Sequence, residues 1–445
     1  MKFRGFLLLL SFSFCPGHAL AESRPLRIEF WHSMTGAKGV LLAEIIKSFN
    51  DSAPAKGTIE VHGQFVGSYD EGLNKLRTSV LAGSEPHIVQ ITDIGAKVMM
   101  DSGRILPLQD LIDADSNEAT DAASKFPLAE ILPPIRHYYE SDGRLQSLPF
   151  ASSNPVLYFN ADMFKSEAIE HPPTNFNELE QDAVKLTHAD RHIQGITWPL
   201  HSWFVEEFVA KQGAVLFDHD NGRAGHASEC YYTSPEVITL ITLWKKMVDN
   251  GSFANVGRGW DPAEQNFLAG RTAMLITSTS DVFELSQTAP FHLGVAAIPG
   301  NGNHPGGGTV IGGNSLWLLR NKPREQQRAA FEFLKFMASA KIQEKWHTHT
   351  GYFPIRQDVI TNLKQSGFYD KFPAAWVAIK QMEQSPDSAA AKGASVGPLP
   401  EAREHIMTAI EEILSHRLSI EAALQKAKAK TDNSLKRYNE GLLKL

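Results

Sequence analysis

The segment at 26–36 begins with side chains that alternate between apolar and polar. Residues 26–30 read Leu-Arg-Ile-Glu-Phe, a period of two that predicts a β-strand, and apolar residues then recur at helical spacing over 40–49. The turn between them, 31–36, carries a tryptophan, two hydroxyl groups and a glycine. Ligands of open α/β sheets bind at the carboxyl ends of strands, where helix N-termini converge, so this turn is a candidate ligand contact.

The alternation of strand-like and helix-like segments continues along the chain and predicts an α/β fold. Strands are expected at 59–65, 88–91, 155–159, 272–277 and 312–319, and helices at 69–81, 95–100, 176–186, 204–212 and 234–248. The strand at 312–319 begins with Gly312 and Gly313, where the missing side chains would let a ligand approach the backbone.

The first 21 residues have the pattern of an export signal. Two basic residues precede an apolar run at 6–14, and the sequence Ala-Leu-Ala at 19–21 is typical of a cleavage site. We therefore predict a signal peptide at 1–21 that is cleaved after Ala21. No later apolar run reaches the roughly 18–20 residues that a transmembrane helix needs. Cys230 is the one cysteine outside the signal, so no internal disulfide is expected.

The size and charge of the remaining chain limit its architecture and its partners. About 420 residues exceed the size at which a single core stops growing, so two lobes are expected. We assign 22–135 and about 281–335 to the amino-terminal lobe, and about 136–280 and 336–445 to the carboxy-terminal lobe. The net charge is -7 at pH 7, and -9 without the two basic residues of the signal. Nucleic acid is therefore not an expected partner, because its phosphates attract basic surfaces.

The sequence lacks the usual signatures of enzymes, metal sites and nucleotide loops. It contains no GxSxG, HExxH, CxxC or GxxxxGK[ST] motif. His347 and His349 are two residues apart on a predicted helix and point to different faces, so we interpret them as solvated. Glu206 and Glu207 are adjacent and diverge, so they cannot flank one glycosidic bond. We predict no catalytic, metal or cofactor site, although a secreted glycosidase or phosphodiesterase built from distant carboxylates stays an alternative.

Several segments combine aromatic rings, hydroxyl groups and glycines. These segments are 31–34, 67–69, 150–154, 198–203, 277–280 and 351–355. Aromatic rings cover the C–H faces of a small molecule while hydroxyls and amides bind its oxygen atoms. Together they indicate a site for a polyhydroxylated or phosphorylated small molecule.

Arg403 is the most unusual charged residue of the chain. A helix that begins after Pro400 places Arg403 on the same face as Ile406 and Ile410. A charge on a buried face needs a partner, which is either a structural carboxylate or an anionic ligand at the helix N-terminus. If the partner is a ligand, removal of Arg403 should weaken binding strongly with little effect on the fold.

Seven motifs, in this order, resemble the periplasmic glycerol-3-phosphate-binding proteins of ABC importers, within the maltodextrin-type solute-binding group. They are FWHSM at 30–34, GSYDEGL at 67–73, PFASSNPVLYFN at 149–160, IGGNSLWL at 311–318, HTHTGYFPI at 347–355, GFYDKFP at 367–373 and KGASVGPLPEAR at 392–403. The resemblance implies a two-lobe fold with a hinge and a ligand cleft between the lobes, no enzymatic activity and no cofactor. It also implies a periplasmic monomer that delivers its solute to an inner-membrane permease with a separate ATPase.

The resemblance also implies which residues bind the ligand. The family's phosphate contacts correspond to Tyr69, Ser153, Gly313, Tyr352 and Arg403, and its glycerol contacts to Asp93, Ser278 and the tryptophan segment.

Two positions depart from the family pattern. Asp93 stands where a glutamate is usual, and Leu200 falls on the first of two pocket tryptophans if Trp203 is the second. A leucine there would leave room for a headgroup, so we predict binding of a glycerophosphodiester such as glycerophosphocholine at least as well as glycerol-3-phosphate. An oligosaccharide is the alternative ligand, for which the rings would matter and Arg403 would not.

Overall fold

The computed structural model describes residues 24–52, 55–118, 125–302, 304 and 306–442. The predicted signal peptide at 1–21, with its cleavage after Ala21, lies outside the described residues. Within these ranges no helix is both long and apolar enough to cross a membrane.

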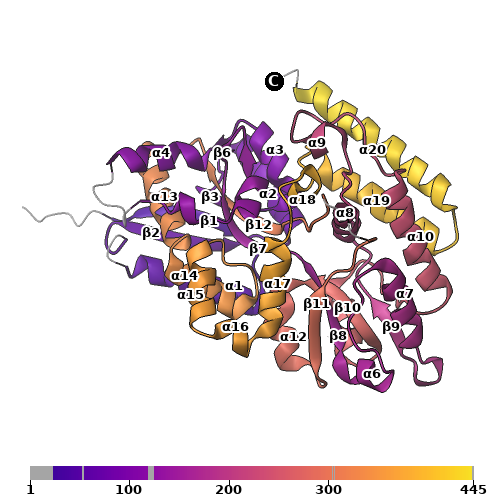
Figure 1. Ribbon diagram of the computed structural model, residues 1–445. Coiled ribbons are helices and arrows are strands. Elements are labelled where there is room, and N and C mark those ends of the chain that lie inside the picture. The colour runs from indigo at the N-terminus through magenta and orange to yellow at the C-terminus, as the bar shows by residue number, and fades with distance from the viewer. Residues whose placement is uncertain (1–23, 53–54, 119–124, 303, 305, 443–445) are drawn as a thin grey trace, which may run out of the picture.

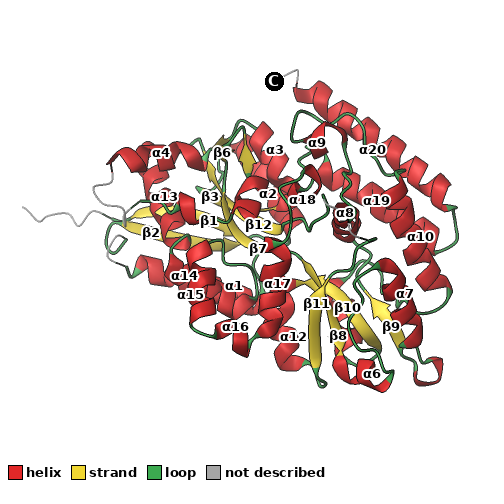
Figure 2. Ribbon diagram, viewed as in Figure 1, coloured by secondary structure: helices red, strands yellow, loops and turns green. Residues whose placement is uncertain are grey.

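Two β-sheets flanked by helices form the two lobes of the protein (Figures 1 and 2). The first sheet has the strand order β2-β1-β3-β12-β4. β7 also pairs with β12, along residues 312–316, whereas β4 pairs with residues 318–319. β1 is parallel to β2 and β3, whereas β12 is antiparallel to β3, β4 and β7. The strands of this sheet are β1 (Leu26–His32), β2 (Ile59–Phe65), β3 (Ile88–Thr92), β4 (Ile105–Leu106), β7 (Leu148–Ser153) and β12 (Gly312–Leu319).

The second sheet has the strand order β11-β8-β10-β9. β8 is antiparallel to both of its neighbours, and β9 is parallel to β10. Its strands are β8 (Pro155–Asn160), β9 (Gln194–Thr197), β10 (Thr272–Ser278) and β11 (Leu293–Ala297), and a separate hairpin is formed by β5 (Glu140–Ser141) and β6 (Arg144–Leu145). All of the strands expected from the sequence are present. β3, β8, β10 and β12 are buried along nearly their whole length, so a short apolar run marks them and not a period of two.

The helices cover both sheets and supply most of the two hydrophobic cores. Those of the first 200 residues are α1 (Gly36–Asn50), α2 (Tyr69–Ala82), α3 (Ala96–Asp101), α4 (Leu108–Glu118), α5 (Pro133–Tyr138), α6 (Ala161–Ser166) and α7 (Phe176–Lys185). The next are α8 (Ser202–Lys211), α9 (Asp218–Gly222), α10 (Pro235–Asp249), α11 (Trp260–Leu268), α12 (Val282–Thr288), α13 (Arg324–Met337) and α14 (Ala340–Thr350). The last are α15 (Gln357–Gln365), α16 (Phe368–Lys371), α17 (Pro373–Glu383), α18 (Ala389–Lys392), α19 (Leu399–Leu414) and α20 (Ile420–Leu442).

One buried residue, Asn154, connects the first sheet to the second. β7 ends at Ser153 in the first sheet and β8 begins at Pro155 in the second. The Asn154 side chain donates to Thr309 Oγ1 at 3.1 Å, in the segment that leads from β11 back to β12. The backbone carbonyl of Asn154 accepts a hydrogen bond from the Thr279 N–H at 2.9 Å, just after β10. Two connections between the sheets therefore meet at Asn154.

Several elements lie in the other lobe from the one predicted from the sequence. β7, assigned to the carboxy-terminal lobe, pairs with β12 of the first sheet, and β11, assigned to the amino-terminal lobe, pairs with β8 of the second. α14, assigned to the carboxy-terminal lobe, packs on α1 and α13 beside the first sheet. Hydrophobic periodicity reveals the type of an element but not its partner, so it could not locate these crossings.

The free cysteine, Cys230, is buried beneath α20. Its backbone N–H donates to Asp432 Oδ1 at 2.8 Å, and its Sγ lies 3.8 Å from the Lys428 carbonyl oxygen. Burial raises the pKa of this thiol to about 12. The thiol is therefore protonated and shielded at neutral pH.

Candidate functional site

Arg403 lies in the first turns of α19 and is 7 % exposed. It shares the buried face of this helix with Ile406 and Ile410, as the spacing predicts. Its Nη2 atom donates to Glu206 Oε2 at 2.6 Å and lies 3.6 Å from Asp93 Oδ2. Of the two kinds of partner expected for this arginine, the structure shows the carboxylate.

The two carboxylates hold the charge on Arg403. Burial alone would lower the pKa of the guanidinium, but Asp93 and Glu206 outweigh that effect and raise it above its usual value. Glu206 is also fixed from its other side, because its Oε1 accepts a hydrogen bond from the Ala394 N–H at 2.8 Å. The ion pair therefore has both of its members anchored in the fold.

Glu207 points away from this ion pair. Its Oε2 accepts from the Val310 N–H at 3.0 Å, and burial raises the pKa of its carboxyl group well above the usual range. Glu206 and Glu207 thus diverge on α8, as predicted from helix geometry.

Tyr69 and Tyr352 come from different ends of the chain and meet beside β12. Tyr69 is the first residue of α2, and its hydroxyl accepts from Asn314 Nδ2 at 3.1 Å. Asn314 Oδ1 in turn accepts from Gln90 Nε2 at 2.7 Å. Burial raises the pKa of Tyr352 to about 12, with an opposing contribution from its hydrogen bond with Tyr69. Both hydroxyls therefore stay protonated and can donate to an oxygen of a ligand.

Lys38, which was not predicted as a site residue, connects α1 to the segment after β10. Its Nζ lies 3.1 Å from Asp281 Oδ1 and 3.2 Å from Ser280 Oγ, and it is 5.3 Å from the centre of the Tyr352 ring. α1 packs beside the first sheet, whereas Asp281 follows a strand of the second. This ion pair therefore joins the two lobes next to the tyrosines. A lone lysine in an amphipathic helix gives no signal of this contact in the sequence.

Gly312 and Gly313 are required by packing within the protein. A side chain on Gly313 would place its Cβ 1.8 Å from the Ala151 carbonyl oxygen, and the residue has a φ of 115°. A Cβ on Gly312 would lie 2.9 Å from Nε1 of Trp203. The close approaches are made by a neighbouring strand and by an indole, so the glycines do not need a ligand to explain them.

Trp203 lies in α8 with a second indole beside it. The centre of the Trp203 ring is 5.8 Å from that of Trp260, the first residue of α11. Leu200, by contrast, is 2 % exposed, and its N–H donates to the Gly257 carbonyl oxygen at 2.8 Å. Leu200, which we expected at the position of a family tryptophan, is therefore a core residue. Trp260, which the sequence spacing did not reveal, places an aromatic ring next to Trp203.

Ser153 ends β7 of the first sheet and Ser278 ends β10 of the second, both at the connection between the lobes. Ser153 is buried and stands opposite Gly312 in the register of β7 and β12. The next segment is close, because the Phe353 N–H donates to the Ser152 carbonyl oxygen at 2.8 Å. Ser278 Oγ accepts from the Ser280 N–H at 3.1 Å. These two serines and the segment at 351–355 therefore lie around the junction of the two sheets.

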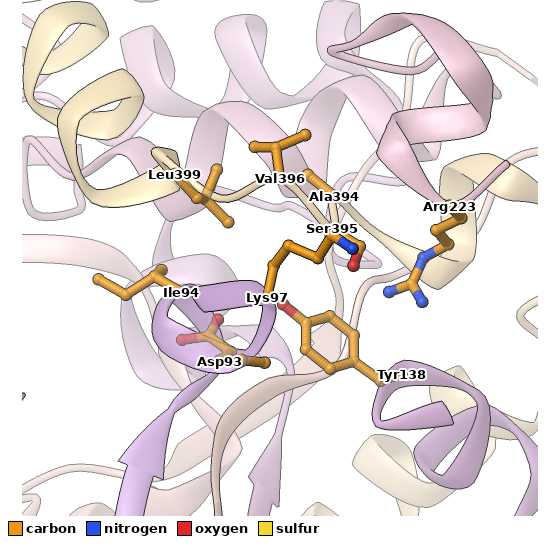
Figure 3. Close-up of a pocket in the computed structure, with 10 residues that line it drawn as sticks. Asp93, Ile94, Lys97, Tyr138, Arg223, Ala394, Ser395, Val396 and Leu399 are labelled. Carbon is orange, nitrogen blue, oxygen red and sulfur yellow. The ribbon is translucent and has the colours of Figure 1, made fainter. Parts of the chain in front are cut away.

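A small cavity of about 10 Å³ lies beside Asp93 (Figure 3). That volume is close to the space of one water molecule. The Tyr138 side chain points into it next to Asp93, and its buried hydroxyl has no hydrogen-bond partner within the described part of the chain. Arg223 closes the other side; its guanidinium donates to the carbonyl oxygens of His137, Lys392 and Gly393.

His347 is not solvated, and this prediction was wrong. It is 1 % exposed, its Nδ1 lies 2.7 Å from the Tyr352 carbonyl oxygen, and its Nε2 lies 3.2 Å from the Tyr369 hydroxyl. Trp346 and His347 both lie on the buried face of α14. The spacing of the two histidines alone did not indicate which face of the helix is buried. No group of three or more histidine, cysteine, aspartate or glutamate side chains in the described ranges could hold a metal ion.

A two-lobe α/β fold with polar and aromatic side chains gathered where the sheets meet is the architecture of a solute-binding protein. Residues 44–379 match the bacterial extracellular solute-binding protein family. Over 440 residues, 97% of each chain, the protein is 30% identical to the sn-glycerol-3-phosphate-binding periplasmic protein UgpB of Salmonella typhimurium. It is also 30% identical to UgpB of Yersinia pseudotuberculosis over 93% of each chain. The chain belongs to the bacterial extracellular solute-binding protein family.

Solved structures confirm the fold. UgpB from Mycobacterium tuberculosis in complex with glycerophosphocholine has a TM-score of 0.76 at 20% identity, covering 94% of this chain and 99% of its own. The cyclic alpha-maltosyl-1,6-maltose binding protein from Arthrobacter globiformis has a TM-score of 0.74 at 19% identity, covering 93% and 100%. The two-lobe fold is therefore established, and the protein binds a solute as a transport component and is not a secreted hydrolase.

Proposed function

We propose that this protein captures a glycerol phosphate in the periplasm, either sn-glycerol-3-phosphate or a glycerophosphodiester such as glycerophosphocholine, and delivers it to an inner-membrane ABC permease whose separate ATPase drives import. Its relatives named sn-glycerol-3-phosphate-binding proteins share 30% of its residues over nearly the whole chain, and a protein of similar fold was solved with glycerophosphocholine. The observation that carries the proposal is the buried guanidinium of Arg403, a cation held between Glu206 and Asp93 in the interior of the protein.

In the proposed binding mode, the tyrosines, Ser153 and Arg403 contact the phosphoryl group. Asp93 and Ser278 contact the glycerol hydroxyls, and Trp203 covers the C–H face of the glycerol. The lobes close over the solute, and the falling local dielectric strengthens the contact between arginine and phosphate. A micromolar dissociation constant corresponds to about -8 kcal/mol, which one charge-assisted contact, several hydroxyl contacts and ring packing can supply.

An oligosaccharide is the second candidate, because Arg403 already has carboxylate partners. Asp93, Glu206 and Arg403 form a polar network, and two indoles lie close together, a combination that suits sugar hydroxyls and sugar ring faces. In this mode the rings dominate binding, and replacement of Arg403 has a small effect on affinity.

Thermal-shift and calorimetric titrations with phosphorylated polyols and maltodextrins separate the two candidates. A stabilisation by sn-glycerol-3-phosphate or glycerophosphocholine and none by maltodextrins supports the proposal, since a ligand that binds the folded state raises its stability. The reverse pattern would establish the oligosaccharide. Native mass spectrometry of freshly purified protein adds an independent measurement, the mass of whatever small molecule is carried along.

A further inference from the structure

Glu206 places a buried negative charge against the arginine that is proposed to bind the phosphoryl group. Its Oε2 is 2.6 Å from Arg403 Nη2, and side chains of both residues are less than a tenth exposed. Asp93 Oδ2 contributes a second carboxylate at 3.6 Å from the same nitrogen. A phosphoryl oxygen that reaches Arg403 therefore comes close to two carboxylates in an environment where water screens charges weakly.

The Glu206 carboxylate cannot easily move out of the way of a ligand. The Ala394 N–H holds its Oε1 at 2.8 Å while Arg403 holds its Oε2. Arg223, the next cation near this carboxylate, donates its hydrogen bonds to backbone carbonyl oxygens. The negative charge of Glu206 is therefore fixed in place, and Arg223 does not form a second ion pair with it.

Repulsion from a fixed carboxylate grows with the charge of the ligand. At neutral pH a phosphomonoester carries about -1.5 to -2 charges because its second pKa is near 6, whereas a phosphodiester carries one. We infer that Glu206 is a specificity residue that disfavours doubly charged phosphomonoesters relative to singly charged glycerophosphodiesters. This inference rests on the proposed function and names the ligand class that the same site prefers.

The test is the ratio of two dissociation constants in a variant that loses only the charge. Glu206→Gln keeps an oxygen that can accept from the Ala394 N–H. Calorimetry at pH 8 compares sn-glycerol-3-phosphate with glycerophosphoglycerol, a diester whose headgroup is uncharged. We expect the wild type to bind the diester more tightly, and Glu206→Gln to reduce this preference at least about tenfold, mainly by tightening the monoester.

Glu207→Gln is the matched control. Glu207 is the next residue on the same helix and is also buried, but its Oε2 accepts from the Val310 N–H instead of from Arg403. Its replacement should leave the ratio of the two dissociation constants within about twofold, because the carboxylate that contacts Arg403 is retained. Circular dichroism and thermal unfolding establish that both variants are folded.

A second measurement uses the unmodified protein, so the inference stays testable if Glu206→Gln does not fold. Between pH 8 and pH 5.5 the monoester loses most of its second charge, and we expect its affinity to rise while that of the diester stays level. A change in the protein itself between these two pH values would affect both ligands, so the diester is the internal control.

Two outcomes would overturn the inference. If Glu206→Gln changes both affinities equally, or leaves the monoester unimproved, then Glu206 acts only as a structural partner of Arg403. If the monoester does not bind more tightly at pH 5.5, then the Glu206 carboxylate does not repel its second negative charge. Binding of neither ligand by the folded wild type would instead refute the proposed function, and the inference with it.

Discussion

Replacing Arg403 should destabilise the folded protein, in addition to any effect on binding. In Arg403→Met the apolar part of the side chain is retained, but Glu206 and Asp93, which are 4 % and 7 % exposed, lose their counter-ion. Removal of one member of a buried ion pair typically costs about 3–5 kcal/mol, because the remaining charge stays buried without compensation. That loss is a large part of the total stability of about 5–15 kcal/mol that is usual for proteins.

The assay is equilibrium urea unfolding followed by circular dichroism at pH 7. Arg437→Met is the control: Arg437 contacts Glu401 of α19, the helix that carries Arg403, but more than half of both side chains is exposed. Exposed pairs contribute about 0–1 kcal/mol, so the control should change stability little. A double variant that adds Glu206→Gln to Arg403→Met should recover at least about 1 kcal/mol, since one buried charge is removed.

Equal costs for Arg403→Met and Arg437→Met would refute this reasoning, because the buried pair would then contribute no more than an exposed one. The expected destabilisation differs from the prediction made from the sequence, in which removal of Arg403 has little effect on the fold. The difference follows from Glu206, whose position against Arg403 could not be known before the fold.

Three further predictions concern packing, the contact between the lobes and the free thiol. Gly313→Ala should lower the free energy of unfolding, measured in urea, by about 2–4 kcal/mol, because its Cβ would collide with a backbone oxygen. Gly441→Ala is the control and should not lower it, because no other atom lies within 4 Å of a Cβ at that position. Lys38→Met should weaken ligand binding about fivefold in calorimetry, because it loses the ion pair that joins the lobes, whereas Lys47→Met removes an exposed pair without effect. Cys230 should not react with a disulfide reagent at pH 8 until urea is added, since burial raises its pKa to about 12; rapid reaction of the folded protein would contradict its burial.

The elements and the site-bearing segments could be predicted from the sequence because each has a local signal. The strand at 312–319 follows from its short apolar run after two glycines, and the buried face of α19 follows from helical spacing. Of the segments rich in glycine, aromatic and hydroxyl residues, those at 150–154, 277–280 and 351–355 lie together at the junction of the sheets. Motif order over the whole chain then identified the family, which a single motif could not have done.

The partners of these residues could not be predicted, because they are set by contacts between distant segments. Glu206 and Arg403 are 197 positions apart, and Lys38 and Asp281 are 243 positions apart. Trp260 lies well away from the tryptophan segment in sequence, although its ring lies next to Trp203. Residue spacing predicted that Leu200 stands where the family has a tryptophan. It could not show that α11 places the Trp260 ring beside Trp203.

The shielded thiol beneath α20 makes the protein a convenient object for fluorescence spectroscopy. Because Cys230 should not compete for thiol-reactive dyes, a pair of cysteines introduced on exposed helices of the two lobes can be labelled without first altering the native residue. Energy transfer between the dyes would then follow the opening and closing of single molecules as solute is added.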